Sequence, residues 1–159
     1  VRTIPSSKMA PQFNELTLRK ALEGRNLEYI FMGKELGGRP DSDNMYDEKG
    51  HVLYNKLAES ELFKFGLERL LNGISKYRVA IMCSEGKPES CHRHLLISRV
   101  LQESNVAVFH ILPNGSLITY QELAKDDNQI ALIELEGGKP WKSVLSVRQE
   151  LQHNDFFKP

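Results

Sequence analysis

The residues best suited to chemistry lie between positions 83 and 94 of this chain of 159 residues. Cys83 and Cys91 stand at either end of a break made by a glycine and a proline, and His92 follows the second cysteine directly. A thiol at a helix start beside a cationic side chain has a lowered pKa and is partly ionised at neutral pH. We therefore expect Cys91 to be the stronger candidate nucleophile, with His92 or Glu85 moving protons. Cys83 takes that role if it is exposed, although its apolar neighbours favour packing.

The same stretch contains an electrostatic conflict that an anion would resolve. With Ser90 as N-cap, a helix would begin at Cys91 and carry the basic residues 92–94 in its first turn. Each positively charged side chain at this end destabilises the helix by about 0.3–1 kcal/mol. An anion held by free backbone N–H groups and by Arg93 would remove the conflict. The alternative is that Glu85 and Glu89 fold back and neutralise Arg93.

A zinc site is a further possibility, formed by Cys83, Cys91 and either His92 or His94. The wide gap between the two cysteines, with no second close pair, does not match the usual short spacing of zinc ligands. The sequence therefore predicts no metal and no other cofactor.

Hydrophobic patterns predict how the chain positions these residues. The short apolar runs Val79–Met82, Leu27–Met32 and Val106–Ile111 are typical of buried strands. Helical patterns alternate with them, including one from Cys91 to about Glu103. We expect an α/β fold with a layered, mostly parallel sheet flanked by helices, and a ligand site at the carboxyl ends of the strands.

Two further groups of residues are candidates for binding an anion at that edge. Arg2 lies at the end of a short strand expected over residues 1–4. Gly37, Gly38 and Arg39 follow the strand expected over residues 27–32, and a double glycine lets backbone N–H groups approach a ligand closely. With Ser90 and Arg93, they form the predicted anion-binding set.

The composition sets broad limits on function. The chain carries 21 basic and 21 acidic residues, so no overall positive field attracts nucleic acid, although a local basic pocket remains open. No run is long enough to span a bilayer, and two cysteines favour free thiols in a reducing cytoplasm. We expect an α/β domain over residues 1–125, with residues 126–159 as its C-terminal extension.

Short motifs spread over about residues 1–124 resemble the domain-of-unknown-function 488 family. They are Val1-Arg2-x-x-Pro5-x-Ser7, Phe13-Asn14, Leu36-Gly37-Gly38, Met82-Cys83-x-Glu85-x-x-Pro88-x-x-Cys91-His92-Arg93, His110-Ile111-Leu112 and Gly115-Ser116. Members of that family usually begin with a strand bearing Thr-Ile-Gly-His-Ser, then a helix and a strand ending in Asp-Val-Arg. This chain starts at Val1, so we expect a trimmed chain. The resemblance implies a fold and a site, not a reaction.

Three functional hypotheses follow. The first is an enzyme that acts on a phosphorylated or nucleotide-like small molecule in an anion-binding crevice. The second is a module that binds nucleic acid or a nucleotide without catalysis. The third is a thiol redox or zinc site. A small anionic ligand is the expected partner, nucleic acid is an alternative, and no membrane partner is expected.

Overall fold

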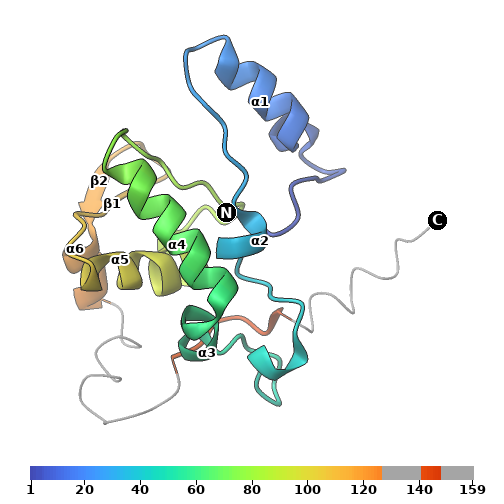
Figure 1. The fold of residues 1–159 in the computed structure, drawn as a ribbon, viewed down its shortest axis with the longest axis vertical. Coiled ribbons are helices and arrows are strands. Elements are labelled where there is room, and N and C mark those ends of the chain that lie inside the picture. The colour runs from blue at the N-terminus through green and yellow to red at the C-terminus, as the bar shows by residue number, and fades with distance from the viewer. Residues whose placement is uncertain (127–140, 148–159) are drawn as a thin grey trace.

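The computed structural model describes residues 1–126 and 141–147, and this part of the chain is mainly helical (Figure 1). A π-helical turn, Arg93–Ser98, leads directly into α5, and 3-10 turns cover Pro11–Phe13, Asp43–Met45 and Pro88–Ser90. The α-helices are α1 (Glu15–Glu23), α2 (Gly33–Leu36), α3 (Tyr54–Glu59), α4 (Glu61–Ile74), α5 (Arg99–Glu103) and α6 (Tyr120–Asp126).

The described residues contain one small sheet, made of β1 (Phe109–Ile111) and β2 (Leu117–Thr119). The two strands are antiparallel, with His110 opposite Ile118, and residues 112–116 connect them. The predicted α/β fold with a layered, mostly parallel sheet is therefore wrong. Of the predicted strand Val106–Ile111, only the last three residues form a strand, and that strand belongs to a hairpin.

The other predicted strands form neither helix nor ladder in the described structure. This holds for residues 1–4, for Leu27–Met32 and for Val79–Met82. Val79 and Met82 are 41% and 44% exposed, so the run is not the buried strand that its composition suggested. Apolar and β-branched residues favour an extended chain, but a ladder also needs a partner strand, which a local pattern does not specify.

Two helices begin directly after residues of types that are common at the N-cap. Asn14 precedes α1, which ends at Gly24, and Ser60 precedes α4, where its hydroxyl accepts a hydrogen bond from the backbone N–H of Phe63 (3.3 Å). Helix α1 buries none of its residues and stands apart from the other helices (Figure 1). Most of the apolar residues of α4 face the core, although Leu62 is 55% exposed.

The hydrophobic core lies between α2, α3, α4 and the helix that runs from Arg93 through α5. Helices α2 and α4 approach closely at Gly66, where a Cβ atom would lie 2.4 Å from the Cβ of Glu35. Only glycine fits there without displacing α2. The largest side chains with almost no exposure are Phe63, Leu36, Leu96, Ile97, His94, Val52 and Cys91.

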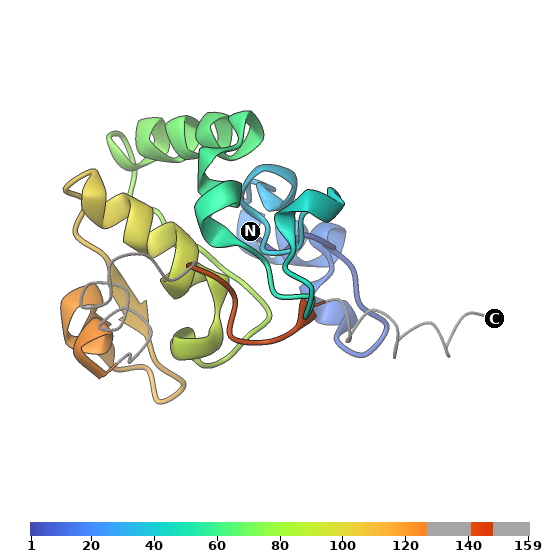
Figure 2. The ribbon, with the colours of Figure 1, turned by 90° about the horizontal axis from the view of Figure 1, so that it is seen from below.

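Residues 141–147 pass from the helix that begins at Arg93 to the loop before α3 (Figure 2). The Trp141 indole N–H donates to the carbonyl of Leu95 (2.5 Å), and the Ser143 hydroxyl accepts from the backbone N–H of Val52 (2.9 Å). This part of the predicted extension 126–159 therefore packs on the core.

Residues 127–140 and 148–159 lie outside the described residues. Within the described chain, no helix is long and apolar enough to cross a membrane.

A buried pair of histidines joins the helix at residues 93–98 to the hairpin. Nδ1 of His94 lies 3.1 Å from Nε2 of His110, and the ring centroids are 4.9 Å apart. The ring of Tyr120 lies against His94 at 5.1 Å between centroids. His94 therefore has a structural role on the side of the helix that carries β1 and α6.

Acidification is expected to destabilise the fold through His110. Burial lowers the pKa of His110 from 6.5 to about 4, and the neighbouring His94 and Arg93 act in the same direction. The unfolded chain therefore takes up this proton at higher pH than the folded chain does. The stability that the neutral His110 contributes to the fold is complete above pH 6.5 and is lost towards pH 4. Over this range the free energy of unfolding should fall by up to about 1.4 kcal/mol per pH unit. Urea unfolding at several pH values measures the slope. The dependence of unfolding free energy on pH should be weaker in His110→Gln. An unchanged slope would mean that His110 does not cause it.

Candidate functional site

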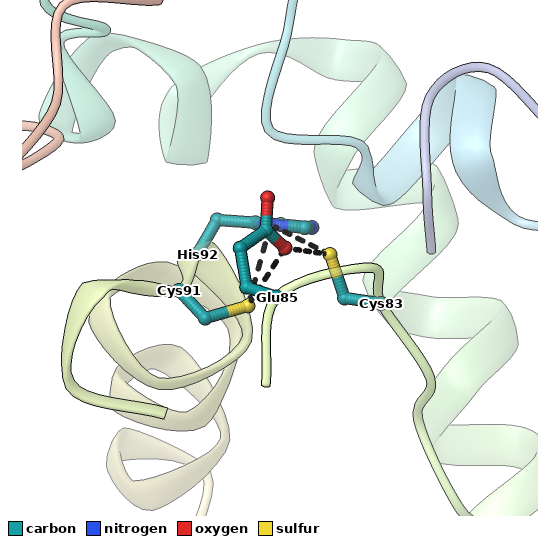
Figure 3. Close-up of side chains that lie close together, drawn as sticks. All are labelled: Cys83, Glu85, Cys91 and His92. Atoms are coloured by element: carbon teal, nitrogen blue, oxygen red, sulfur yellow. Dashed lines mark hydrogen bonds between the residues drawn. The ribbon is translucent and has the colours of Figure 1, made fainter. Parts of the chain in front are cut away.

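Four potential metal ligands meet at the start of the helix that follows the 3-10 turn (Figure 3). They are Cys83, Glu85, Cys91 and His92, and one ligand atom of each lies within 4.8 Å of all the others. Cys83 and Glu85 come from the irregular segment after residue 82, and Cys91 and His92 come from the start of the helix. The chain thus folds back at residues 86–90 and brings the two halves of the motif together.

The local sequence explains this reversal. Pro88 opens the 3-10 turn Pro88–Ser90, where its fixed φ suits a first helical position, and its carbonyl accepts from the backbone N–H of Cys91 (3.0 Å). Cys91 is extended, and its carbonyl then accepts from the N–H groups of His94 and Leu95, both at 3.0 Å. The helix therefore begins after Cys91, slightly later than the predicted start with Ser90 as N-cap.

The imidazole of His92 is oriented for binding through Nδ1. Its Nε2 lies 3.1 Å from the carbonyl of Val1, which can only accept, so the ring proton is on Nε2. Nδ1 faces the two thiols, at 3.7 Å from Sγ of Cys83 and 3.8 Å from Sγ of Cys91, and it can bind a metal when it carries no proton. Gly38 packs on the ring, where a Cβ atom would lie 2.7 Å from Cγ of His92. The backbone of two distant segments therefore fixes this side chain.

Arg93 holds the buried thiol of Cys91. Its Nε and backbone N–H groups donate to Sγ of Cys91 at 3.1 and 3.4 Å, and its Nη2 donates to the carbonyl of Glu85 (2.6 Å). Neither alternative from the sequence describes this arrangement completely. The guanidinium is held by Glu85, but through the backbone carbonyl and not through the carboxylate.

The two thiols are coupled. The hydrogen bond from Cys91 lowers the pKa of Cys83, and contacts with His92 and Glu85 act in the same direction. The same hydrogen bond, together with burial, raises the pKa of Cys91. Both thiols also donate to Oε2 of Glu85, Cys91 at 3.4 Å. In the protein alone, the first negative charge on sulfur therefore lies on Cys83, the more exposed cysteine.

A pocket of about 370 Å³ lies against one side of the cluster. Among its walls are predicted site residues from four separate segments, namely Arg2, Gly38, Arg39, Cys83, Glu85, Ser90 and His92. Cys91, Arg93 and Gly37 do not line it. Gly37 instead packs against the N-terminal segment, where a Cβ atom would lie 2.4 Å from the hydroxyl of Thr3. The alternative zinc ligand His94 lies at the buried pair with His110.

The sequence did not predict that Ser143, Leu145 and Val147 line the pocket, which they do together with Tyr54. These residues come together because Leu53 pairs with Lys142, a contact that no local pattern could indicate. Burial, together with the negative charge of the neighbouring cluster, raises the pKa of Tyr54. Its hydroxyl therefore stays protonated at neutral pH and can donate a hydrogen bond.

Residues 1–100 match the family described as Domain of unknown function DUF488, and the chain belongs to this family. The resemblance seen in the sequence motifs is thus confirmed. All four ligand candidates, as well as Gly38 and Arg93, lie within the matched residues. No curated protein and no solved structure matches the chain.

Proposed function

We propose that this protein binds a zinc ion in the cluster formed by Cys83, Glu85, Cys91 and His92. The observation that carries the proposal is the gathering of their four ligand atoms within 4.8 Å of one another. Zn–S bonds of about 2.3 Å and Zn–N bonds of about 2.0–2.1 Å place tetrahedral ligand atoms roughly 3.5–3.8 Å apart. The contacts of Nδ1 of His92 with the two sulfur atoms, at 3.7 and 3.8 Å, fit this spacing.

The surroundings of the four ligands also suit zinc. A ligating histidine commonly donates its other ring N–H to a backbone carbonyl, as His92 does to Val1. Two thiols and a carboxylate in contact repel one another when ionised, and a divalent cation between them would remove this repulsion. Thiolate and imidazole ligands favour zinc over magnesium or calcium, which prefer oxygen.

The zinc content of the purified protein tests this proposal. Native mass spectrometry of protein equilibrated with zinc should give one ion per chain, retained when a weak chelator is present. The variant His92→Gln should lose the ion. The control His51→Gln should retain it, because His51 pairs with Asp47 and lies outside the four-residue cluster. A protein that takes up no zinc, but joins Cys83 to Cys91 on mild oxidation, would favour the thiol redox alternative instead.

The pocket supports a second candidate function, the binding of a small anionic molecule such as a phosphorylated compound or a nucleotide. Arg2 and Arg39 bring two positive charges to its walls, and Ser90 and Ser143 add hydroxyl groups. Its volume of about 370 Å³ lies at the lower end of the range for small-molecule sites. Titration of the metal-free protein with a nucleoside monophosphate, followed by NMR, tests this function separately from zinc binding. Unshifted resonances at the pocket residues would contradict it.

A further inference from the structure

We infer that Glu85 is not a permanent zinc ligand but the residue that takes a proton from a water bound to the zinc, so that the site is hydrolytic. This inference rests on the proposed zinc site. Cys83, Cys91 and His92 would supply the three protein ligands, and water would occupy the fourth position. Three protein ligands with one open position are typical of catalytic zinc, whereas structural zinc sites have four protein ligands.

The four side chains are held to different degrees. Sγ of Cys91 accepts two N–H groups of Arg93, and the ring of His92 is fixed by the carbonyl of Val1. Among the described residues, by contrast, the Glu85 carboxylate is hydrogen-bonded only to the two thiols. These are bonds that zinc binding would break, because both thiols must lose their protons. In the described part of the chain, the Cys83 thiol likewise bonds only within the cluster, to Glu85 and His92. Of these two side chains, only the carboxylate of Glu85 is suited to take a proton from water and return it.

The segment that carries Glu85 is irregular, and Arg93 holds its backbone carbonyl but not its carboxylate. It has no regular secondary structure at residues 85–87, and the following residue is Gly86, around which a Cβ atom would meet nothing within 4 Å. One carboxylate oxygen of Glu85 points towards the sulfur atoms and the other points away from them (Figure 3). A small displacement of the side chain would leave space for a water molecule between the carboxylate and the metal.

The fourth position would open into the pocket. Cys83, Glu85 and His92 line the pocket, whereas Cys91 is fully buried behind them. A water at this position would be accessible to a substrate in the pocket. Zinc lowers the pKa of a bound water to about 7. In zinc enzymes with cysteine and histidine ligands, a glutamate that is not a ligand can act as the general acid and base.

The proposed reaction balances as a hydrolysis. With zinc held by Cys83, Cys91 and His92, the Glu85 carboxylate would take one proton from a water molecule as the water oxygen adds to an electrophilic carbon or phosphorus atom. The bond to the leaving group breaks with its electron pair, and Glu85 returns the proton to the leaving group. One water is consumed, and no redox partner is needed.

The pocket walls indicate the class of substrate. Arg2 and Arg39 would bind a phosphate or carboxylate group, and Ile4, Leu145 and Val147 offer apolar surface to the rest of the molecule. We therefore assign a small anionic molecule with a hydrolysable bond as the substrate.

Cobalt substitution tests the inference, because the visible spectrum of Co²⁺ reports its coordination. Glu85→Gln should bind one Co²⁺ per chain. Its affinity for Co²⁺ should fall by less than about 10-fold relative to the unchanged protein, because about 10-fold is the smallest loss usual when a group outside the ligand set is removed. In Cys83→Ser the affinity for Co²⁺ should fall by more than about 100-fold, which is the largest loss usual for a group outside the ligand set. Inorganic phosphate should change the spectrum of the unchanged protein by displacing the bound water.

Two outcomes would overturn the inference. If Glu85→Gln loses Co²⁺ as completely as Cys83→Ser, then Glu85 is a ligand. If phosphate leaves the spectrum unchanged at concentrations up to its solubility limit, the fourth position is closed. Failure of the unchanged protein to bind Co²⁺ or Zn²⁺ at all is a different result, which contradicts the proposed zinc site itself.

Discussion

Cys91→Ser is expected to abolish zinc binding while leaving the fold in place. Cys91 is fully buried, and its sulfur accepts two hydrogen bonds from Arg93, so it is the most firmly positioned thiol of the cluster. Serine can still accept those hydrogen bonds, but its hydroxyl is not ionised at neutral pH and is a poor zinc ligand. The zinc affinity should fall by more than the roughly 10–100-fold usual for loss of a group outside the ligand set.

Competition with a chromophoric chelator measures this loss. Thermal unfolding of the metal-free proteins is the control, because the unchanged protein and Cys91→Ser should then differ by no more than about 1–3 kcal/mol, the cost of an imperfectly satisfied buried polar group. If the variant retains zinc with unchanged affinity, Cys91 is not a ligand.

Gly38→Ala is expected to disrupt the same site from a distant part of the sequence. The added Cβ atom would lie 2.7 Å from Cγ and 3.0 Å from Nδ1 of His92, so the ring must shift and change the position of Nδ1 relative to the two thiols. The hydrogen bond from Nε2 to the carbonyl of Val1 restrains this shift. We expect a loss of about 1–3 kcal/mol in unfolding free energy from overpacking, and a loss of zinc affinity of about 10–100-fold.

Gly24→Ala is the matched control for this substitution. Gly24 follows α1 directly with helical backbone angles, and a Cβ atom there would meet nothing within 4 Å. Chemical denaturation and the chelator competition should therefore show no loss for Gly24→Ala. Equal zinc affinities for the two alanine variants would show that Gly38 does not position His92.

The candidate site was more predictable than the fold. Cys83, Glu85, Cys91 and His92 lie within ten positions of one another in sequence, and all four are residue types that bear chemistry. Their roles as nucleophile and proton carriers remain predictions. Sequence spacing weighed against zinc because the cysteines are far apart. The turn at Pro88 removes that objection, since it brings both sulfur atoms to the same carboxylate oxygen.

The sheet could not be predicted because its signal is not local. The apolar run Val79–Met82 has the composition of a buried strand, but no described strand pairs with it. Helix α4 was predictable because its cap, Ser60, and its apolar stripe lie within one continuous segment. The pocket wall formed by residues 141–147 depends on the pairing of Leu53 with Lys142, which are far apart in sequence.

X-ray absorption spectroscopy at the zinc edge tests the central claim most directly, because it identifies the atoms bound to the metal. The proposed site predicts two sulfur neighbours at about 2.3 Å, with one imidazole nitrogen and one further nitrogen or oxygen at about 2.0–2.2 Å. Both sulfur contributions should be absent from the Cys83→Ser, Cys91→Ser double variant if any zinc remains bound. A shell of oxygen and nitrogen alone in the unchanged protein would place the metal elsewhere and contradict the proposed zinc site.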